Sequence, residues 1–226
     1  MDKVKKPARV NEASASGTRR GASAAAPKSG RRKASSAPPA GRVIFLIGFT
    51  GAGKSTVGRL LAIRMGNPFI DLEQEISLRA GMATPMIVSR YGEEGYRSFE
   101  TAVLGKVLEP AENISAIVAT GDGIVDVPRN VDTMRHHGLV CFLHATFEEV
   151  LRRLSSEVPV RPLVQDRDTL LRNFDLRSKL YDAAAHLTLA TDQRDPSQIV
   201  LELAQKLDEH DKARSRSRGS KRTRSG

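Results

Sequence analysis

A glycine-rich segment between an apolar run and an amphipathic run is the feature of this sequence that most constrains its fold. The segment Gly48–Thr56 reads GFTGAGKST and fits the P-loop pattern G-x-x-x-x-G-K-[ST]. The run before it, RVIFLI over residues 42–47, is typical of a buried parallel strand. Apolar residues after it recur at helical spacing as far as Gly66, which suits a helix C-cap. This order of strand, loop and helix predicts a nucleotide-binding α/β domain.

The loop carries a physical mechanism for binding phosphate. Its small residues let successive backbone N–H groups point at phosphate oxygens, and the following helix directs its positive end at the same charge. We expect Lys54 to reach the β- and γ-phosphates and the Ser55 hydroxyl to ligate Mg²⁺. The predicted nucleotide-binding residues of the loop are Gly51, Ala52, Gly53, Lys54, Ser55 and Thr56.

Five short apolar segments alternate with helical patterns along the chain. The expected strands are residues 43–47, 68–71, 116–120, 139–144 and 186–191. The expected helices are residues 54–65, 92–108, 129–136, 146–155, 169–184 and 196–208. Thr146 with Glu149 predicts a capping box, and Asp195 before Pro196 predicts another helix start. Such alternation predicts one α/β domain, residues 42–211, with a parallel sheet covered by helices on both faces.

Carboxylates follow two of the expected strands. Asp71 and Glu73 come at the end of the second strand, and Asp122 follows the third. Ligands of open α/β sheets collect at the carboxyl ends of the strands. Beside a P-loop, such carboxylates are suited to holding Mg²⁺ through water and to receiving a substrate hydroxyl. The alternative for Asp71 is that it caps the next helix.

Charge is distributed unevenly along the chain. The net charge is +10, yet residues 1–42 hold 11 basic and 2 acidic residues and residues 212–226 hold 7 basic and none acidic. We therefore expect residues 1–41 and 212–226 to be disordered basic tails. The first tail is a solubilising extension or, alternatively, an organelle transit peptide. Contact of the tails with nucleic acid is open but not favoured, because neither has an aromatic residue to stack on bases.

Cysteine content and hydropathy bear on the compartment. The single cysteine, Cys141, excludes an intrachain disulfide framework and fits a reducing compartment. It lies in an apolar run, so we expect a buried, unreactive thiol. No apolar stretch approaches the length of a membrane span. We expect a cytoplasmic monomer, or a protein of a plastid or another organelle if the first tail is a transit peptide.

Several segments together resemble the shikimate kinases. They are GFTGAGKSTVGRLLA (48–62), FIDLEQEI (69–76), RAGM (79–82), RYGEEGYRSFE (90–100), VATGDGIV (118–125), VRPLV (160–164) and LRSKLYDAAAHL (176–187). The resemblance implies a three-layer α/β/α fold like that of nucleoside monophosphate kinases, with a five-stranded parallel sheet in the order 2-3-1-4-5. It also implies transfer of the γ-phosphate of ATP, with Mg²⁺, to the 3-hydroxyl of shikimate. That reaction belongs to aromatic amino-acid biosynthesis.

The resemblance implies roles for residues on the acceptor side. Asp71 matches the acid that serves Mg²⁺ and its water, and Glu73 matches the acid that binds ring hydroxyls. Arg97 and Arg177 match two arginines that bind the acceptor carboxylate. A guanidinium binds a carboxylate in a forked, charge-assisted way, so two arginines can orient a small acid. With Asp122, these residues give the implied acceptor site: Glu73, Arg97, Asp122 and Arg177.

On the nucleotide side, Arg161 matches a lid arginine that closes over the phosphates, and Arg153 matches an arginine that stacks on adenine. The connection 157–169 is expected to be mobile and to exclude water when it closes. The implied catalytic residues are Lys54, Asp71 and Arg161. Ser55 and Asp71 are the implied residues of the metal site.

Two residues depart from the family pattern. Glu73 stands where the family has Asp, which moves its carboxylate by one methylene. Asp122 replaces the middle one of three glycines and brings a negative charge beside the acceptor carboxylate. At an effective dielectric of about 20 and a separation of roughly 6 Å, that repulsion approaches 3 kcal/mol. Three functions therefore stay open: a shikimate kinase, a related P-loop kinase with a changed small-molecule acceptor, and a catalytically weakened nucleotide-binding module.

Overall fold

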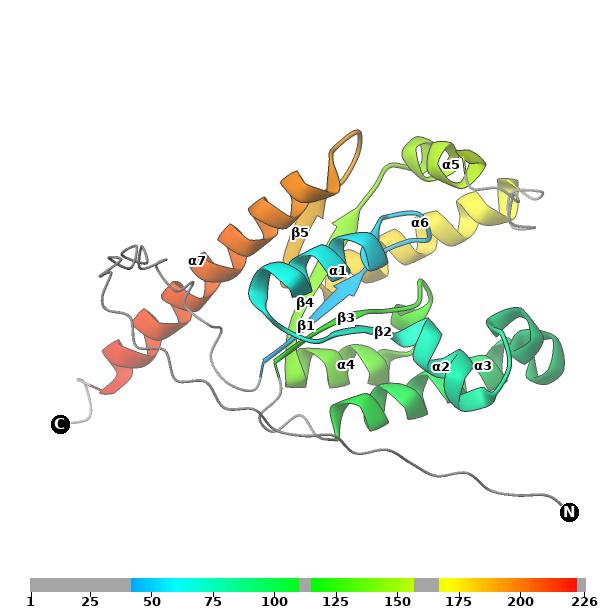
Figure 1. Ribbon diagram of the computed structural model, residues 1–226, viewed down its shortest axis with the longest axis horizontal. Helices are drawn as coiled ribbons and strands as arrows, with labels where there is room; N and C mark the ends of the chain where they lie inside the picture. The colour runs from blue at the N-terminus through cyan, green and yellow to red at the C-terminus, as the bar shows by residue number, and fades with distance from the viewer. Residues whose placement is uncertain (1–41, 110–114, 157–166, 223–226) are drawn as a thin grey trace, which may run out of the picture. The chain divides into compact units, whose positions relative to one another are not determined.

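A parallel sheet forms the centre of the protein (Figure 1). The computed structural model describes residues 42–109, 115–156 and 167–222. Five strands pair in the order β2-β3-β1-β4-β5, which confirms the order that the resemblance implied. All four pairings are parallel. The strands are β1 (Val43–Ile47), β2 (Phe69–Asp71), β3 (Ala116–Ala119), β4 (Gly138–His144) and β5 (Leu187–Ala190).

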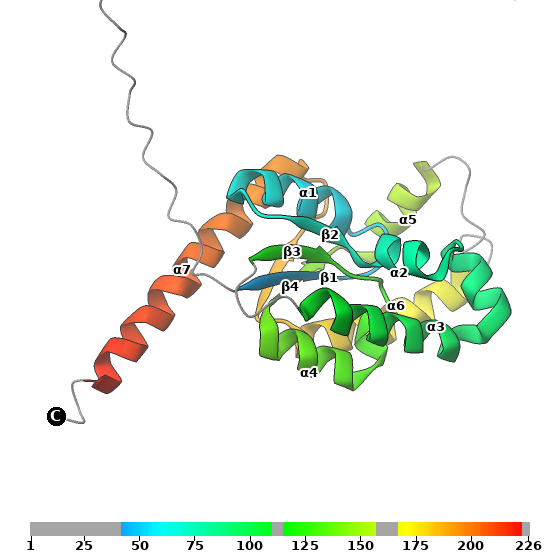
Figure 2. The ribbon, with the colours of Figure 1, turned by 60° about the horizontal axis from the view of Figure 1, so that its bottom comes forward.

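Helices cover both faces of the sheet. Figure 2 shows α1 and α7 on one face and α3, α4 and α6 on the other, which confirms the three-layer α/β/α fold. A short 3₁₀ helix, η1 (Ile124–Asp126), follows β3. The α-helices are α1 (Lys54–Met65), α2 (Leu72–Ala80), α3 (Thr84–Leu108), α4 (Pro128–His137), α5 (Phe147–Ser156), α6 (Arg167–Ala184) and α7 (Pro196–Arg222).

The core lies between the sheet and its helices. Every residue of β1 is buried, as a strand covered on both faces requires. Leu61 of α1 and Leu203 of α7 are fully buried on one side, and Tyr181 of α6 on the other. Each such side chain contributes roughly 1.5–3 kcal/mol through its burial. The core thereby fixes the carboxyl ends of the strands, where the candidate site lies.

Cys141 of β4 lies inside this core. Its side chain is completely buried and forms no disulfide. Burial raises the pKa of the Cys141 thiol to about 12. The expected burial of this thiol is confirmed, and its raised pKa is consistent with the low reactivity that we expect.

The structure agrees with the expected strand boundaries. Each expected strand is present, with ends displaced by at most one residue. α1 has the expected bounds and ends at Gly66, whose φ of 68° lies in the left-handed region that favours glycine. These elements carry strong local signals, a β-branched or Leu-rich run in each strand and a glycine at the end of the helix.

Two α-helical segments between β2 and β3 were not expected from the sequence. α2 is one, and it buries only Leu72 and Ile76, so its apolar period is weak. The other is the beginning of α3, which starts at Thr84 rather than at Gly92. The chain is non-helical at Gly92, with φ of 72° and ψ of 177°, so two helices meet there. The expected start at Gly92 therefore marks this kink and not the first turn of the helix.

α7 extends beyond its expected end at Asp208. It runs to Arg222, through residues 212–222, for which we expected disorder. Leu207 is the last buried residue among the α7 side chains that the structure describes. Lys, Arg and Ala are good helix formers and no proline interrupts this part, so the helix continues past its packed turns. The other expected tail, residues 1–41, lies outside the described residues, and the boundaries at 41 and 211 stay predictions.

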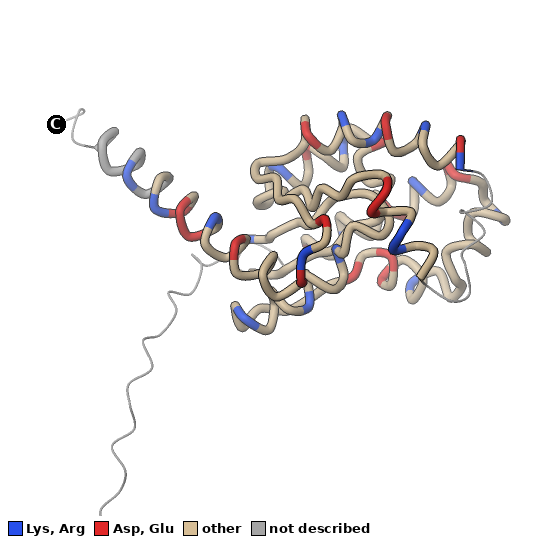
Figure 3. Tube along the Cα trace, turned by 90° about the horizontal axis from the view of Figure 1, so that it is seen from above, with Lys and Arg blue, Asp and Glu red and all other residues tan. Residues whose placement is uncertain are grey.

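Charge on the described part of the chain is mixed. Figure 3 shows acidic and basic residues interspersed along the trace. The high net charge of the chain is therefore not a property of its α/β domain.

None of the described helices combines the length and the apolar character that a membrane span requires.

Candidate active site

The P-loop connects β1 to α1 in a conformation that requires glycine. Gly48 and Gly53 have φ of 143° and 93°, which side-chain-bearing residues rarely adopt. A Cβ atom at Gly48 would also lie 2.5 Å from the carbonyl oxygen of Leu143 in β4. The loop at the N-terminus of α1 therefore requires glycine at both positions to keep its conformation. A loop of this shape at a helix N-terminus is suited to binding phosphate.

The two reactive side chains of the loop have defined partners. Lys54 Nζ donates to the carbonyl oxygens of Gly48, at 2.8 Å, and Phe49, at 3.0 Å. Ser55 Oγ donates to Asp71 Oδ2 at 2.7 Å. Lys54 thus lies along the inner side of the loop, and Ser55 connects α1 to the end of β2.

Asp71 caps the helix that follows it, which is one of the two alternatives that the sequence left open. Its Oδ1 accepts a hydrogen bond from Gln74 N at 3.4 Å, which caps α2. Its other oxygen accepts the bond from Ser55. A cap therefore holds the carboxylate beside the P-loop serine, where a metal-binding acid has to lie.

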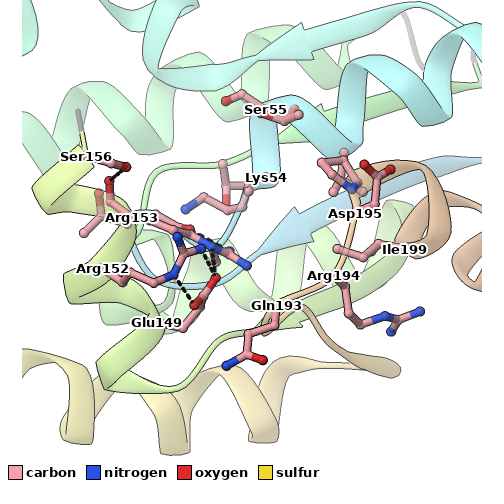
Figure 4. A pocket seen from close by; sticks show the side chains of 18 of the residues that line it. Lys54, Ser55, Glu149, Arg152, Arg153, Ser156, Gln193, Arg194, Asp195 and Ile199 are labelled. Atoms are coloured by element: carbon pink, nitrogen blue, oxygen red, sulfur yellow. Dashed lines mark hydrogen bonds and ion pairs between the residues drawn. The ribbon is translucent and has the colours of Figure 1, made fainter. Parts of the chain in front are cut away.

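A cavity of about 910 Å³ extends from the P-loop (Figure 4). Its volume is in the range of small-molecule sites. α5 forms one wall, and the connection between β5 and α7 forms another. The cavity therefore has room for a nucleoside behind the phosphates. Its lining includes Gly51, Ala52, Gly53, Lys54, Ser55, Thr56, Glu73, Arg152, Arg153, Gln193, Arg194 and Asp195.

Arg153 ties three elements of this cavity together. Its Nη1 donates to the carbonyl oxygen of Gly51 at 2.9 Å, and its Nη2 donates to that of Thr191 at 2.5 Å. Its Nε donates to Glu149 Oε1 at 2.7 Å. The predicted adenine residue thus lies in the wall and braces the P-loop against α5 and the end of β5.

Arg152, which the sequence reasoning did not select, also lines the cavity. It shares Glu149 with Arg153, but 64% of its side chain is exposed against 20% for Arg153. Hydrogen bonds from Arg152, followed by those from Arg153, lower the pKa of Glu149 to about 2. Arg152 thus has the more exposed side chain of the two, and both arginines bind Glu149 (Figure 4).

The two expected helix starts near this cavity differ in outcome. Ser197 N donates to Asp195 Oδ1 at 2.8 Å, so the cap of α7 is confirmed. Glu149 N donates to Thr146 Oγ1 at 3.4 Å, which is one half of the expected capping box. The other half is wrong, because the Glu149 carboxylate binds the two arginines and Thr146 N donates to Asp192.

The connection from β5 to α7 is a part of the site that the sequence reasoning missed. Gln193 and Arg194 line the cavity, and Gln193 has a positive φ of 50°, which is uncommon outside glycine. The available signal was Asp195 before Pro196, which marks a helix start just past the carboxyl end of a strand.

The acceptor side brings together Arg97 of α3 and Arg177 of α6. Arg177 Nη2 donates to Asp126 Oδ2 at 2.7 Å, and Arg97 Nη2 lies 3.6 Å from the same oxygen. Arg177 Nη1 also donates to Asp122 Oδ2 at 3.2 Å. Three of the predicted acceptor residues, Arg97, Asp122 and Arg177, thus gather in one cluster with Asp126. This cluster lies next to η1, at the carboxyl end of β3.

Arg97 is hydrogen-bonded to a buried acid. Glu100 is fully buried, and its Oε2 accepts a hydrogen bond from Arg97 Nη1 at 2.8 Å. Burial raises the pKa of Glu100 to about 7, and the nearby Arg97 opposes that rise. Its other oxygen and the Tyr96 hydroxyl are buried without a hydrogen-bond partner among the described residues. Arg97 is therefore paired with an acid whose carboxylate cannot reach water.

Glu73 lies between the two sides of the site. It lines the nucleotide cavity, and its Oε1 would be 3.4 Å from a Cβ atom at Gly121. Glu100 Oε1 would be 2.7 Å from the same Cβ, so a side chain at this position would meet both acids. Gly121 thus lets the end of β3 pass close to the acids of α2 and α3.

Sequence reasoning missed Glu100, Asp126 and Tyr181. Tyr181 donates a hydrogen bond from its hydroxyl to the carbonyl oxygen of Asp122. Glu100 had a usable signal, since it follows Arg97 by three residues on a helix. Of the expected mobile connection 157–169, residues 157–166, with Arg161, lie outside the described residues. The expectation is wrong for residues 167–169, which form the first turn of α6.

Comparison with known proteins identifies the family. The family model described as "Shikimate kinase" matches residues 50–208. The chain belongs to the shikimate kinase family. A shikimate kinase of Marinomonas sp. (strain MWYL1) is 38% identical over 170 residues, which are 74% of this chain and 92% of the relative. A shikimate kinase of Nitrosospira multiformis is 39% identical over 167 residues, 73% of this chain and 84% of that relative.

The solved structures agree with this shikimate kinase assignment. A shikimate kinase from Acinetobacter baumannii, solved in complex with shikimate, matches with a TM-score of 0.69 at 31% identity. The match covers 75% of this chain and 94% of that one. The family, the fold and the class of enzyme, an ATP-dependent phosphotransferase, are thereby confirmed.

Proposed function

We propose that this protein transfers the γ-phosphate of ATP to the 3-hydroxyl of shikimate. The observation that carries the proposal is the convergence of Arg97 and Arg177, from separate helices, on Asp126 past the carboxyl end of β3. Guanidinium groups bind carboxylates through forked, charge-assisted hydrogen bonds. A nucleotide-binding module without an acceptor would have no use for such a pair.

Mg²⁺ fits the residues present beside the P-loop. Ser55 Oγ and Asp71 Oδ2 are 2.7 Å apart, and both are oxygen donors of the kind that Mg²⁺ prefers. The described residues contain no group of three or more His, Cys, Asp or Glu that could hold a metal. That suits an ion held by one or two protein ligands and completed by phosphate oxygens and water. When bound, Mg²⁺ neutralises charge on the transferring phosphate.

Lys54 provides the charge of the protein itself at the phosphates. It now donates to two loop carbonyl groups, and the β- and γ-phosphate oxygens of ATP would replace these acceptors. The transferring phosphoryl group spreads negative charge over its oxygens in the transition state, and fixed cations stabilise that charge. We assign this role to Lys54 and, from its motif, to Arg161.

Glu73 and the arginines would orient the acceptor. Arg97 and Arg177 take the carboxylate, and Glu73, placed between the cluster and the cavity, accepts a ring hydroxyl. With its carboxylate and one ring hydroxyl held, the acceptor would direct another hydroxyl at the γ-phosphate. Positioning of this kind supplies a large part of the catalysis of phosphoryl transfer.

A panel of acceptors tests the proposal. The full chain with MgATP is given shikimate, its methyl ester or quinate, and the products are identified by phosphorus NMR. We expect kcat/KM for the ester to be at least about a hundredfold lower than for shikimate, because the ester has no charge for the arginines. A faster reaction with quinate would instead support the kinase with a changed acceptor, which Asp122 in place of glycine favours.

We also propose that the protein acts in the cytoplasm as a monomer. The free, buried thiol of Cys141 fits a reducing compartment, and the relatives named above are bacterial. Size-exclusion chromatography with light scattering tests the oligomeric state. A stable dimer would contradict that part of the proposal.

A further inference from the structure

The arginines of the proposed carboxylate site are already bound by acids of the protein itself. Arg177 donates from Nε to both Asp126 oxygens, at 3.1 and 3.2 Å, and from Nη2 to Oδ2 at 2.7 Å. Its Nη1 donates to Asp122 Oδ2 at 3.2 Å. Arg97 donates from Nη1 to Glu100 at 2.8 Å, and its Nη2 faces Asp126 at 3.6 Å. Three acids thus surround two arginines.

Asp126 binds Arg177 in the way that a substrate carboxylate would bind it. It occupies the edge formed by Nε and Nη2, which is one of the forked faces of a guanidinium. Burial alone would lower the pKa of Arg177, but the bonds to Asp126 and the charge of Asp122 raise it. Arg177 is therefore charged whether or not a ligand is present. Its Nε and Nη2 edge, which suits a carboxylate, is occupied by Asp126.

Charge balance makes a further carboxylate unfavourable in this cluster. Asp122 and Asp126 alone balance the charges of the two arginines, and Glu100, when it is ionised, brings the net charge of the cluster to −1. Glu73 on α2 adds to the negative charge that faces the cluster. An acceptor carboxylate would therefore bind the Nε and Nη2 edge of Arg177 only if Asp126 gave it up.

Asp126 and Asp122 are the acids able to move away. Their side chains are 32% and 29% exposed, whereas that of Glu100 is 0% exposed. Asp126 is the last residue of the short helix η1, so rotation of its side chain would carry the carboxylate into water. Glu100 has no such path and stays under Arg97.

We propose that Asp126, assisted by Asp122, is a built-in competitor for the acceptor carboxylate. It holds Arg177 in the empty site, and the acceptor binds by displacing it. The competitor lowers acceptor affinity and excludes hydroxylated compounds without a carboxylate, which cannot displace it. This inference rests on the proposed function in one respect, namely that the acceptor carboxylate binds Arg97 and Arg177.

The first test measures shikimate binding to full-length protein by calorimetry. Asp126→Asn keeps the shape of the side chain and removes its charge, so we expect the shikimate Kd to fall about tenfold. Asp132→Asn, on the exposed face of α4, is the matched control and should leave this Kd unchanged. The ATP Kd should be the same in all three proteins. An unchanged or higher shikimate Kd in Asp126→Asn would overturn the proposal.

A second variant guards against a folding defect. Asp122→Asn removes the single contact to Nη1, so the shikimate Kd should fall by about threefold. Thermal unfolding of each variant shows whether it is folded. If Asp126→Asn does not fold, Asp122→Asn decides the question. A lower shikimate Kd in that variant supports the proposal, and an unchanged or higher Kd overturns it.

A third measurement does not depend on the identity of the acceptor. Phenylglyoxal labels arginines, and mass spectrometry gives the rate at Arg177 in the free protein. We expect faster labelling of Arg177 in Asp126→Asn than in the wild type or in Asp132→Asn. Equal rates would contradict the competitor. If the wild type neither binds nor phosphorylates shikimate, the proposed function fails, and the labelling rates alone decide on Asp126.

Discussion

The nucleotide side and the acceptor side of the site are built in different ways. The nucleotide side begins with one contiguous segment, Gly48–Thr56, whose backbone conformation depends on glycine. The acceptor side is assembled from side chains of separate elements, namely α2, α3, η1 and α6. The first therefore tolerates little change, whereas the second can acquire new charges, such as Asp122, and still keep its arginines together.

The two sides also differ in what holds them. Backbone hydrogen bonds and left-handed φ angles shape the loop, and these contribute nearly the same energy in any sequence that forms them. Partly buried ion pairs shape the acceptor cluster, and their net contribution depends on every neighbouring charge. Variants on the two sides should consequently affect different measured constants.

The largest effect is expected from Lys54→Met. The substitution removes the cation at the transferring phosphate, so kcat should fall by about a thousandfold. Initial rates of ADP release with saturating shikimate measure it. Lys106→Met on the exposed part of α3 is a control and should keep the wild-type rate. A rate within about tenfold of the wild type would remove Lys54 from the mechanism.

Arg97→Ala should affect the acceptor side and not the nucleotide side. We expect the acceptor Kd to rise about a hundredfold while the ATP Kd stays the same. The change also leaves Glu100 buried without its cation, which is destabilising. The double variant Arg97→Ala, Glu100→Gln avoids that stability problem and should show the same acceptor defect. A normal acceptor Kd in both variants would exclude Arg97 from the site.

Glu100 should make stability depend on pH. Its pKa is raised to about 7 in the folded state, so between its ordinary value of 4.5 and 7 the folded state binds more protons than the unfolded state. The contribution of Glu100 to the free energy of unfolding therefore falls as pH rises through this range, by about 3 kcal/mol.

Urea unfolding of the wild type and of Glu100→Gln, at about pH 5 and about pH 8, measures this dependence. Relative to the wild type, Glu100→Gln should have a higher free energy of unfolding at the higher pH than at the lower pH. A difference that is independent of pH would show that Glu100 stays ionised throughout.

The smallest effect separates Arg153 from Arg152 on the nucleotide side. Arg153→Ala removes bonds to Gly51, Glu149 and Thr191, and the ATP Kd should rise about tenfold. Arg152→Ala removes an exposed side chain that donates to Glu149, and we expect at most about a twofold change. The reverse order, measured by nucleotide titration, would assign the adenine contact to Arg152.

The contrast between the two sides also explains what the sequence could predict. All five strands and α1 carry local signals, and each lies within one residue of its expected position. The strand order came from the family resemblance, because no local pattern encodes it. α2 and the start of α3 were missed, since α2 buries two side chains and α3 is interrupted at Gly92.

The same limit applies within the site. The loop residues and Asp71 could be selected from their positions at the carboxyl ends of expected strands. Asp126 could not be found in this way, because its partner Arg177 is 51 residues away and only the packing of α6 against η1 joins them. Arg153 was selected for stacking on adenine, yet its bonds to Gly51 and Thr191 depend on the fold.

The central claim is that both sides work together on one acceptor, and a coupled ADP-release assay tests it most directly. The full-length protein is given MgATP with and without shikimate. We expect release that depends on shikimate, at the rates of about 1–100 per second that are ordinary for kinases. Binding of ATP without any release that depends on shikimate would contradict the account.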